Sequence, residues 1–115
     1  ALGLGTGNYR GAARIKLERL GLWSRFAFGG YGDETPRRVD VIRRGAAEGL
    51  RRSGASPHEL FVIGDTPADI EAGRAVGARV LSVATGPYGT EELAELRPDG
   101  IFPTLLEALS AGFWG

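Results

Sequence analysis

Two aspartates follow an apolar run in the middle of the chain. The run Phe61-Val62-Ile63-Gly64 leads into Asp65, and Asp69 stands four residues later at the predicted start of a helix. Open parallel α/β sheets bind ligands beyond the carboxyl ends of their strands. Carboxylate oxygens at such a place suit a hard divalent cation. Asp65 is therefore a candidate metal ligand.

Asp69 has two interpretations, which one residue can combine. It is a second candidate metal ligand beside Asp65. It also stands three residues after Thr66, where a carboxylate accepts a hydrogen bond from the backbone of the residue that caps the helix. Pro67, at the first helical position, supports a helix start here. Capping and metal binding both remain open for Asp69 at this point.

Two other segments have the composition of an anion site. Thr6, Gly7 and Asn8 follow a short apolar segment and precede a predicted helix, where a hydroxyl and free backbone N–H groups can bind an anion. A plain helix cap at Thr6 is the alternative. Arg37 and Arg38 stand at the predicted first turn of another helix, where the helix dipole disfavours cations unless an anion is bound. The alternative for these two is a solvated basic face.

Composition excludes several classes of protein. The 115 residues suffice for one domain, and 14 basic residues balance 14 acidic ones, so no basic surface for nucleic acid is indicated. There is no cysteine and one histidine, which excludes disulfides and thiolate or His-rich metal sites. No apolar run approaches the roughly 18 residues of a membrane span, and no signal peptide is visible. A soluble, cytoplasmic protein is the expectation.

Strands are predicted to alternate with helices along the chain. Because the apolar strands lack period-2 alternation, both faces should be buried, as in a parallel sheet. The predicted class is α/β, a Rossmann-like parallel sheet flanked by helices. The expected strands cover residues 1–6, 26–28, 60–63, 78–83 and 100–102, and the expected helices 8–20, 36–53, 67–76, 90–96 and 103–109, with Thr35 capping the second.

Taken together, these segments resemble the haloacid dehalogenase-like (HAD) superfamily, in particular its phosphoglycolate-phosphatase-like members. Residues 64–69, Gly-Asp-Thr-Pro-Ala-Asp, are similar to the fourth motif of the family, Gly-Asp-x-x-x-Asp. Residues 4–8 resemble the second motif, whose Thr or Ser binds the phosphoryl group. Arg38 best fits the third motif, usually a Lys, with Arg37 as the alternate. Lys16 stands too early, inside the first helix.

The resemblance implies a chemistry and a set of roles. It implies a Mg²⁺-dependent phosphohydrolase that acts on a small phosphorylated metabolite through an aspartyl-phosphate. Thr6, Gly7, Asn8 and Arg38 would bind phosphate, with Thr6 and Arg38 counted as catalytic. Asp65 and Asp69 would form the binding site for Mg²⁺.

The first motif of the family, Asp-x-Asp after an apolar strand, has no match in this chain. Asp33, Asp40 and Asp99 are the other aspartates, and none follows such a strand. The family places the strand with this motif between the strands that end at Thr6 and Asp65. We therefore expect residues 1–115 to be the C-terminal portion of a HAD-like core, with the nucleophile, the central strand and the cap domain on an N-terminal segment. The chain alone should then be inactive.

Other functions remain open. A non-catalytic or truncated HAD-like binding module would explain the missing nucleophile, although the Gly-Asp-x-x-x-Asp segment argues against it. A dehalogenase or a phosphomutase of the same superfamily is a third hypothesis, and a dehalogenase would need no Mg²⁺. A receiver-like or flavodoxin-like binding domain does not explain the order of Thr6, Arg38 and Asp65.

Overall fold

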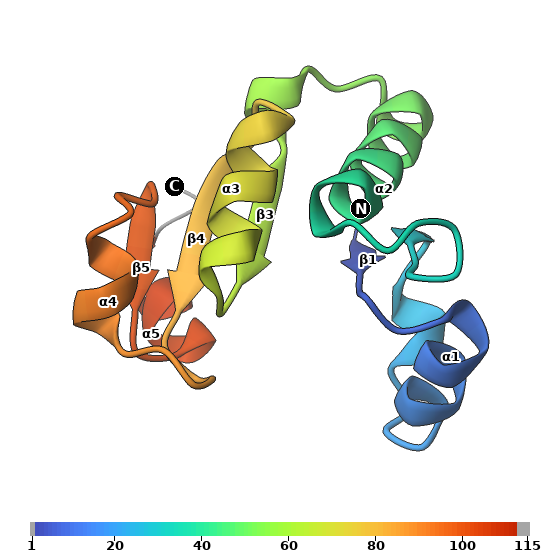
Figure 1. The fold of residues 1–115 in the computed structure, drawn as a ribbon, viewed down its shortest axis with the longest axis horizontal. Helices are drawn as coiled ribbons and strands as arrows, with labels where there is room; N and C mark the ends of the chain where they lie inside the picture. The colour runs from blue at the N-terminus through green and yellow to red at the C-terminus, as the bar shows by residue number, and fades with distance from the viewer. Residues whose placement is uncertain (1, 113–115) are drawn as a thin grey trace. The chain divides into compact units, whose positions relative to one another are not determined.

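The structure, a computed structural model, describes residues 2–112 apart from the side chain of His58. The chain divides into two compact units, Ala1–Pro57 and His58–Gly115. The first unit contains β1 (Gly3–Gly5), α1 (Arg10–Glu18), β2 (Phe28–Gly30) and α2 (Arg38–Ser53), with a short 3₁₀ turn at Trp23–Arg25 (Figure 1). A 3₁₀ turn at Pro57–Glu59 spans the boundary in the sequence. The second unit contains β3 (Phe61–Gly64), α3 (Pro67–Ala75), β4 (Arg79–Val83), α4 (Thr90–Ala94), β5 (Gly100–Phe102) and α5 (Leu105–Ser110).

The first unit is a parallel pair of strands covered by a helix. β1 pairs with β2, and α2 packs on both strands (Figure 1). The strand predicted over residues 26–28 lies two residues later in the structure. It covers Phe28–Gly30 and so includes two glycines. A Cβ on Gly30 would lie 2.0 Å from the carbonyl oxygen of Val41 in α2. Glycine is required here by the close approach of a helix backbone, and not by a turn.

The start of α2 differs from the prediction. Arg37, and not Thr35, is the N-cap residue, with φ −88° and ψ 125°, and the helix begins at Arg38. The Thr35 hydroxyl instead accepts a hydrogen bond from the backbone N–H of Arg37 at 3.3 Å. This local bond closes a turn before the helix. The predicted end of the helix is confirmed, since Gly54 adopts a left-handed conformation with φ 71°.

The second unit is a three-stranded parallel sheet with the order β3-β4-β5. Alternate residues of β4 face opposite layers. Val80 packs with Ile70 of α3 and Leu93 of α4, whereas Leu81 and Val83 pack with Ala108 of α5. Helices therefore cover both faces of this sheet, which confirms the predicted α/β class.

β1 and β3 each have an unpaired edge within the described residues. β1 has β2 as its sole neighbour, and β3 has β4. An unpaired edge leaves a row of backbone N–H and C=O groups without strand partners. Both edges could accept the expected additional strand, which stays a prediction. In the part of the chain that the structure describes, no helix is long and apolar enough to cross a membrane.

Candidate functional site

Asp65 lies directly after β3, and its side chain is half-buried. Its carboxylate makes no hydrogen bond or ion pair within residues 2–112. The loop that follows β4 passes over it, because a Cβ on Gly86 would lie only 2.1 Å from Asp65 Oδ2. A carboxylate held at a strand end without a protein partner keeps its oxygens for a ligand.

Asp69 is buried, with an exposed fraction of 6%. Its Oδ2 accepts hydrogen bonds from the backbone N–H groups of Asp65 and Thr66, both at 3.1 Å, and from the Thr66 hydroxyl at 2.9 Å. The predicted capping role is thus confirmed. Gly64 makes room for this carboxylate, since a Cβ there would lie 2.3 Å from Asp69 Cγ. Asp69 therefore fixes the backbone that carries Asp65.

Of these two carboxylates, Asp65 suits Mg²⁺ as a direct ligand better than Asp69 does. Mg²⁺ usually takes one or two protein carboxylates and keeps several waters. Asp65 fits as a direct ligand because its oxygens have no partner within the described residues. Asp69 Oδ2 is already engaged, so its hydrogen bonds favour a positioning role. No group of three metal-ligating side chains occurs among the described residues, so further ligands would have to come from elsewhere. The metal role of both aspartates stays a prediction.

Thr6 follows β1 and closes a local turn. Its Oγ1 accepts hydrogen bonds from the backbone N–H of Asn8 at 3.1 Å and from Asn8 Nδ2 at 3.0 Å. It does not cap the next helix, because α1 begins at Arg10 with Tyr9 as its N-cap. No described residue accepts the hydroxyl hydrogen of Thr6. The hydroxyl can therefore still donate to an anion.

Lys16 was set aside in the sequence, but the structure brings it to this turn. Its Nζ donates to Asn8 Oδ1 at 3.3 Å, and the same Asn8 contacts Thr6. Side chains in a helix tilt toward its N-terminus, so a long side chain two turns into α1 reaches back to the start. That direction was the signal that the sequence analysis missed. Lys16 adds a cation beside the Thr6 turn.

Arg38 is the first residue of α2. Ile42, one turn later, packs against Gly5 at the end of β1, where a Cβ would lie 2.5 Å from Ile42 Cδ1. The first turn of α2 therefore lies at the carboxyl end of β1, the same end as Thr6. Arg37 points elsewhere, since its side chain is 77% exposed and its Nε pairs with Asp40 at 3.7 Å. The half-buried Arg38 is thus the better of the two candidates.

Comparison with known proteins decides the family. The family described as HAD-hydrolase-like matches residues 40–108, more than half of the chain. This chain belongs to the HAD-like hydrolases. The match contains Asp65 and Asp69, and the HAD-like assignment confirms the resemblance inferred from the sequence.

Relatives of this HAD-like chain include phosphatases. A phosphoglycolate phosphatase from Synechococcus elongatus is 31% identical over 110 residues, which cover 96% of this chain and 50% of the relative. The pyrophosphatase PpaX from Bacillus pumilus is 34% identical over 61 residues, 53% of this chain and 28% of the relative. The chain therefore spans about half or less of the relatives it matches.

Solved HAD-like structures share the fold. A haloacid dehalogenase-like hydrolase from Streptococcus pneumoniae has a TM-score of 0.77 at 25% identity, covering 93% of this chain and 50% of the other. A structure described as a β-phosphoglucomutase from Thermotoga maritima has a TM-score of 0.71 at 19% identity, with coverages of 93% and 50%. The second likeness shows the fold alone.

The candidate residues of this HAD-like chain fall into two groups. Thr6, Gly7, Asn8 and Arg38 lie at one end of the first unit, and Asp65 and Asp69 lie at the end of β3 in the second. Within each unit the structure gathers the residues that the sequence predicted. Each group lies at the carboxyl end of a parallel strand, which is where ligands bind in such sheets.

Proposed function

We propose that the protein containing this chain is a Mg²⁺-dependent phosphohydrolase for a small phosphorylated metabolite, which acts through an aspartyl-phosphate. The observation that carries the proposal is the Asp65 carboxylate, which has no partner within the described residues and whose backbone Asp69 holds in place. The phosphatase relatives support the reaction class. The nucleophilic aspartate would come from a segment outside these residues.

The residues of the first unit would bind the phosphoryl group. The Thr6 hydroxyl would donate to a phosphate oxygen, as would the backbone N–H of Gly7. Lys16 holds Asn8 against Thr6 and so keeps the turn in its binding conformation. The Arg38 guanidinium would offset negative charge on the phosphate oxygens. Fixed donors aimed at developing charge are worth several kcal/mol of transition-state stabilisation.

In the second unit, Asp65 would hold the cation and Asp69 would orient Asp65. Mg²⁺, when bound, offsets the charge on the carboxylate and the phosphate as they approach each other. The nucleophilic carboxylate would form a bond to phosphorus as the bond to the leaving oxygen breaks, and water would then release inorganic phosphate. Without that carboxylate, residues 1–115 alone should not turn over substrate.

The test is hydrolysis by the full-length protein. With p-nitrophenyl phosphate and with 2-phosphoglycolate as substrates, we expect phosphate release in the presence of Mg²⁺ and none in EDTA. Acid quench should trap phosphate on one aspartate, which mass spectrometry would locate. Release that persists in EDTA would overturn the metal role, and a full-length protein with no hydrolysis of any phosphorylated metabolite would overturn the proposed function.

A non-catalytic binding module is the second candidate. It is supported by one observation: no Asp-x-Asp motif follows an apolar strand within these 115 residues. On this hypothesis the chain would bind a phosphorylated ligand without breaking it. Calorimetric binding of phosphate by the full-length protein, with no turnover, would support it against the phosphohydrolase.

Replacing Arg38 by Ala should reduce kcat/KM of the full-length protein by about 10²–10³-fold, because a fixed charge at the phosphate is lost. Arg37→Ala is the matched control, since Arg37 is exposed and pairs with Asp40. We expect the control to change kcat/KM by less than about threefold, as surface ion pairs contribute little. Equal effects of the two substitutions would show that Arg38 has no special role. Steady-state kinetics on both variants decide.

A further inference from the structure

The first unit contains a cavity of about 630 Å³ that the proposed function does not use. Its walls come from the first residue of α1, the 3₁₀ turn, β2 with residues before and after it, and one side of α2. Thr6, Asn8 and Arg38 are not among its lining residues. The cavity is therefore separate from the phosphate-binding turn within the same unit.

Arg10 lines the cavity and is held by two aromatic rings. Its guanidinium carbon lies 5.8 Å from the ring centroid of Trp23 and 5.6 Å from that of Tyr31. These cation–π contacts use the flat face of the guanidinium and leave its N–H edge available. Within the described part of the chain, this guanidinium makes no ion pair or hydrogen bond. Asp33 accepts a hydrogen bond from the Arg10 backbone N–H at 3.1 Å, but no carboxylate among these residues pairs with the guanidinium itself.

Tyr31 supplies a second hydrogen-bonding group in the same place. The residue is 6% exposed, yet its hydroxyl has no hydrogen-bond partner among the residues that the structure describes. The hydroxyl lies over Gly29, another lining residue, where a Cβ would be 2.7 Å away. The hydroxyl is not among the fully buried polar atoms that lack a partner, so it remains accessible. It can therefore donate a hydrogen bond to a polar group that enters the cavity.

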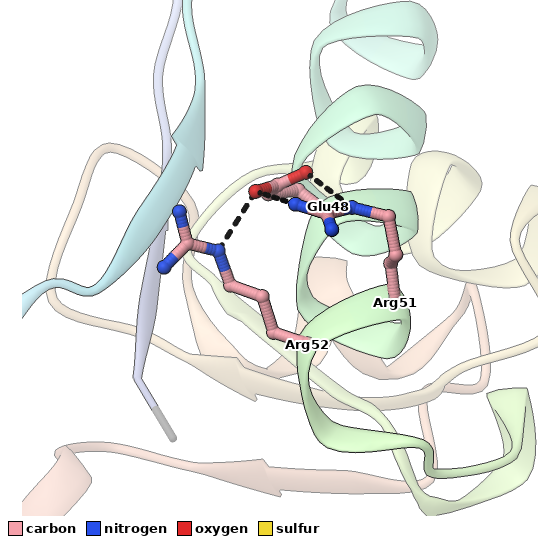
Figure 2. A network of polar contacts seen from close by, with 3 residues as sticks. All are labelled: Glu48, Arg51 and Arg52. Atoms are coloured by element: carbon pink, nitrogen blue, oxygen red, sulfur yellow. Dashed lines mark hydrogen bonds and ion pairs between the residues drawn. The ribbon is translucent and has the colours of Figure 1, made fainter.

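The wall that α2 contributes is basic, and its side chains are held in place by hydrogen bonds. Glu48 accepts hydrogen bonds from Arg51 Nε at 3.2 Å and Nη2 at 2.7 Å, and from Arg52 Nε at 2.7 Å (Figure 2). The hydrogen bonds from Arg51 and then Arg52 lower the pKa of Glu48 to about 2, so it remains ionised at neutral pH. It orients two guanidinium groups while offsetting one charge. The Arg52 Nη groups remain available for an acceptor.

The charges of the lining favour an anion. The cavity is lined by four arginines and two glutamates, Glu34 and Glu48. Glu34 pairs with Arg44 at 3.1 Å, and Glu48 pairs with both Arg51 and Arg52. An excess of two positive charges remains, and Arg10 contributes one of them. Trp23 and Tyr31, with ring centroids 6.4 Å apart, give the same cavity an aromatic wall.

We propose that this cavity binds a small anion with a flat aromatic body. Its anionic group would accept hydrogen bonds from Arg10, Arg52 and the Tyr31 hydroxyl, and its ring would pack against the aromatic wall. The site lies outside the proposed phosphohydrolase centre and makes no covalent change to its ligand. Adenosine 5′-monophosphate is a suitable probe, because adenosine and inorganic phosphate supply its two halves separately.

The test is a titration of the full-length protein with adenosine 5′-monophosphate in EDTA, followed by calorimetry and tryptophan fluorescence. We expect saturable binding that quenches Trp23, with adenosine and inorganic phosphate each binding at least about tenfold more weakly. Tyr31→Phe and Arg10→Ala should each weaken binding by about three- to tenfold or more, since each removes a donor to a charged group. Trp23→Phe should abolish the quenching.

Two controls separate this site from others. Arg19→Ala removes an exposed arginine that does not line the cavity, and it should leave the affinity unchanged. Thr6→Ala should also leave it unchanged, because Thr6 belongs to the other site. Absence of binding at millimolar probe would overturn the proposal. So would binding that Tyr31→Phe, the most conservative variant, and Arg10→Ala both leave unaltered.

Discussion

Replacing Asp65 by Asn should reduce Mg²⁺-dependent phosphate hydrolysis by the full-length protein by about 10³-fold or more, equivalent to about 4 kcal/mol of transition-state stabilisation. Asparagine keeps the shape of the side chain but removes the charge that attracts the cation. The fold should be preserved, because the Asp65 carboxylate makes no hydrogen bond or ion pair within residues 2–112. The free energy of unfolding should change by less than about 1 kcal/mol.

The measurement combines kinetics with metal binding. Steady-state rates at increasing Mg²⁺ should show that Asp65→Asn weakens the apparent affinity for Mg²⁺ as well as kcat. Glu71→Gln is the matched control, because it changes a carboxylate to an amide at an exposed position of α3. The control should have wild-type kinetics. Wild-type turnover and Mg²⁺ dependence in Asp65→Asn would remove this residue from the metal site.

Features that depend on local chemistry could be predicted from the sequence. The helix that starts at Pro67 followed from Thr66 and Asp69, whose capping bonds form within three residues. The left-handed glycines at Gly54 and Gly77, with φ of 71° and 76°, end helices as expected. The parallel strands followed from their apolar runs, because both faces of the second sheet are covered.

Features that depend on tertiary contacts could not be predicted from the sequence. Gly30 lies outside the predicted strand, but it is a strand position that the α2 backbone approaches, and the sequence does not show which helix will pack there. Threonine commonly caps helices, yet the Thr35 hydroxyl accepts a hydrogen bond from the Arg37 backbone N–H and closes the turn before α2. Both errors arose because a glycine or a threonine satisfies several local rules, and the packing of α2 selects among them.

The candidate site shows the same division. Asp65 could be predicted because a strand end and a motif locate it without reference to other elements. The role proposed for Arg10 could not be predicted in this way. It depends on the rings of Trp23 in the 3₁₀ turn and of Tyr31 directly after β2. Lys16 lay within reach of prediction, because the direction of helical side chains is general. Side chains that converge from distant segments need the folded backbone before they can be grouped.

Replacing Asp69 by Ala should lower the free energy of unfolding of the second unit by about 2–4 kcal/mol, the largest stability effect that we expect. The substitution removes the acceptor of three hydrogen bonds at a buried position. Two backbone N–H groups and a hydroxyl would lose their partner, and unsatisfied buried donors cost about 1–3 kcal/mol each before relaxation. Loss of the helix cap lies within that total.

Urea denaturation followed by circular dichroism measures this effect, and two further variants serve as controls. Asp40→Ala removes a first-turn aspartate from α2, whose partners are the exposed Arg37 and Arg43, so it should cost less than about 1 kcal/mol. Asp69→Asn keeps an oxygen that can still accept the backbone bonds, so its cost should lie between the two. A cost for Asp69→Ala no greater than for Asp40→Ala would refute the positioning role, because a carboxylate that orders Asp65 must first hold its backbone.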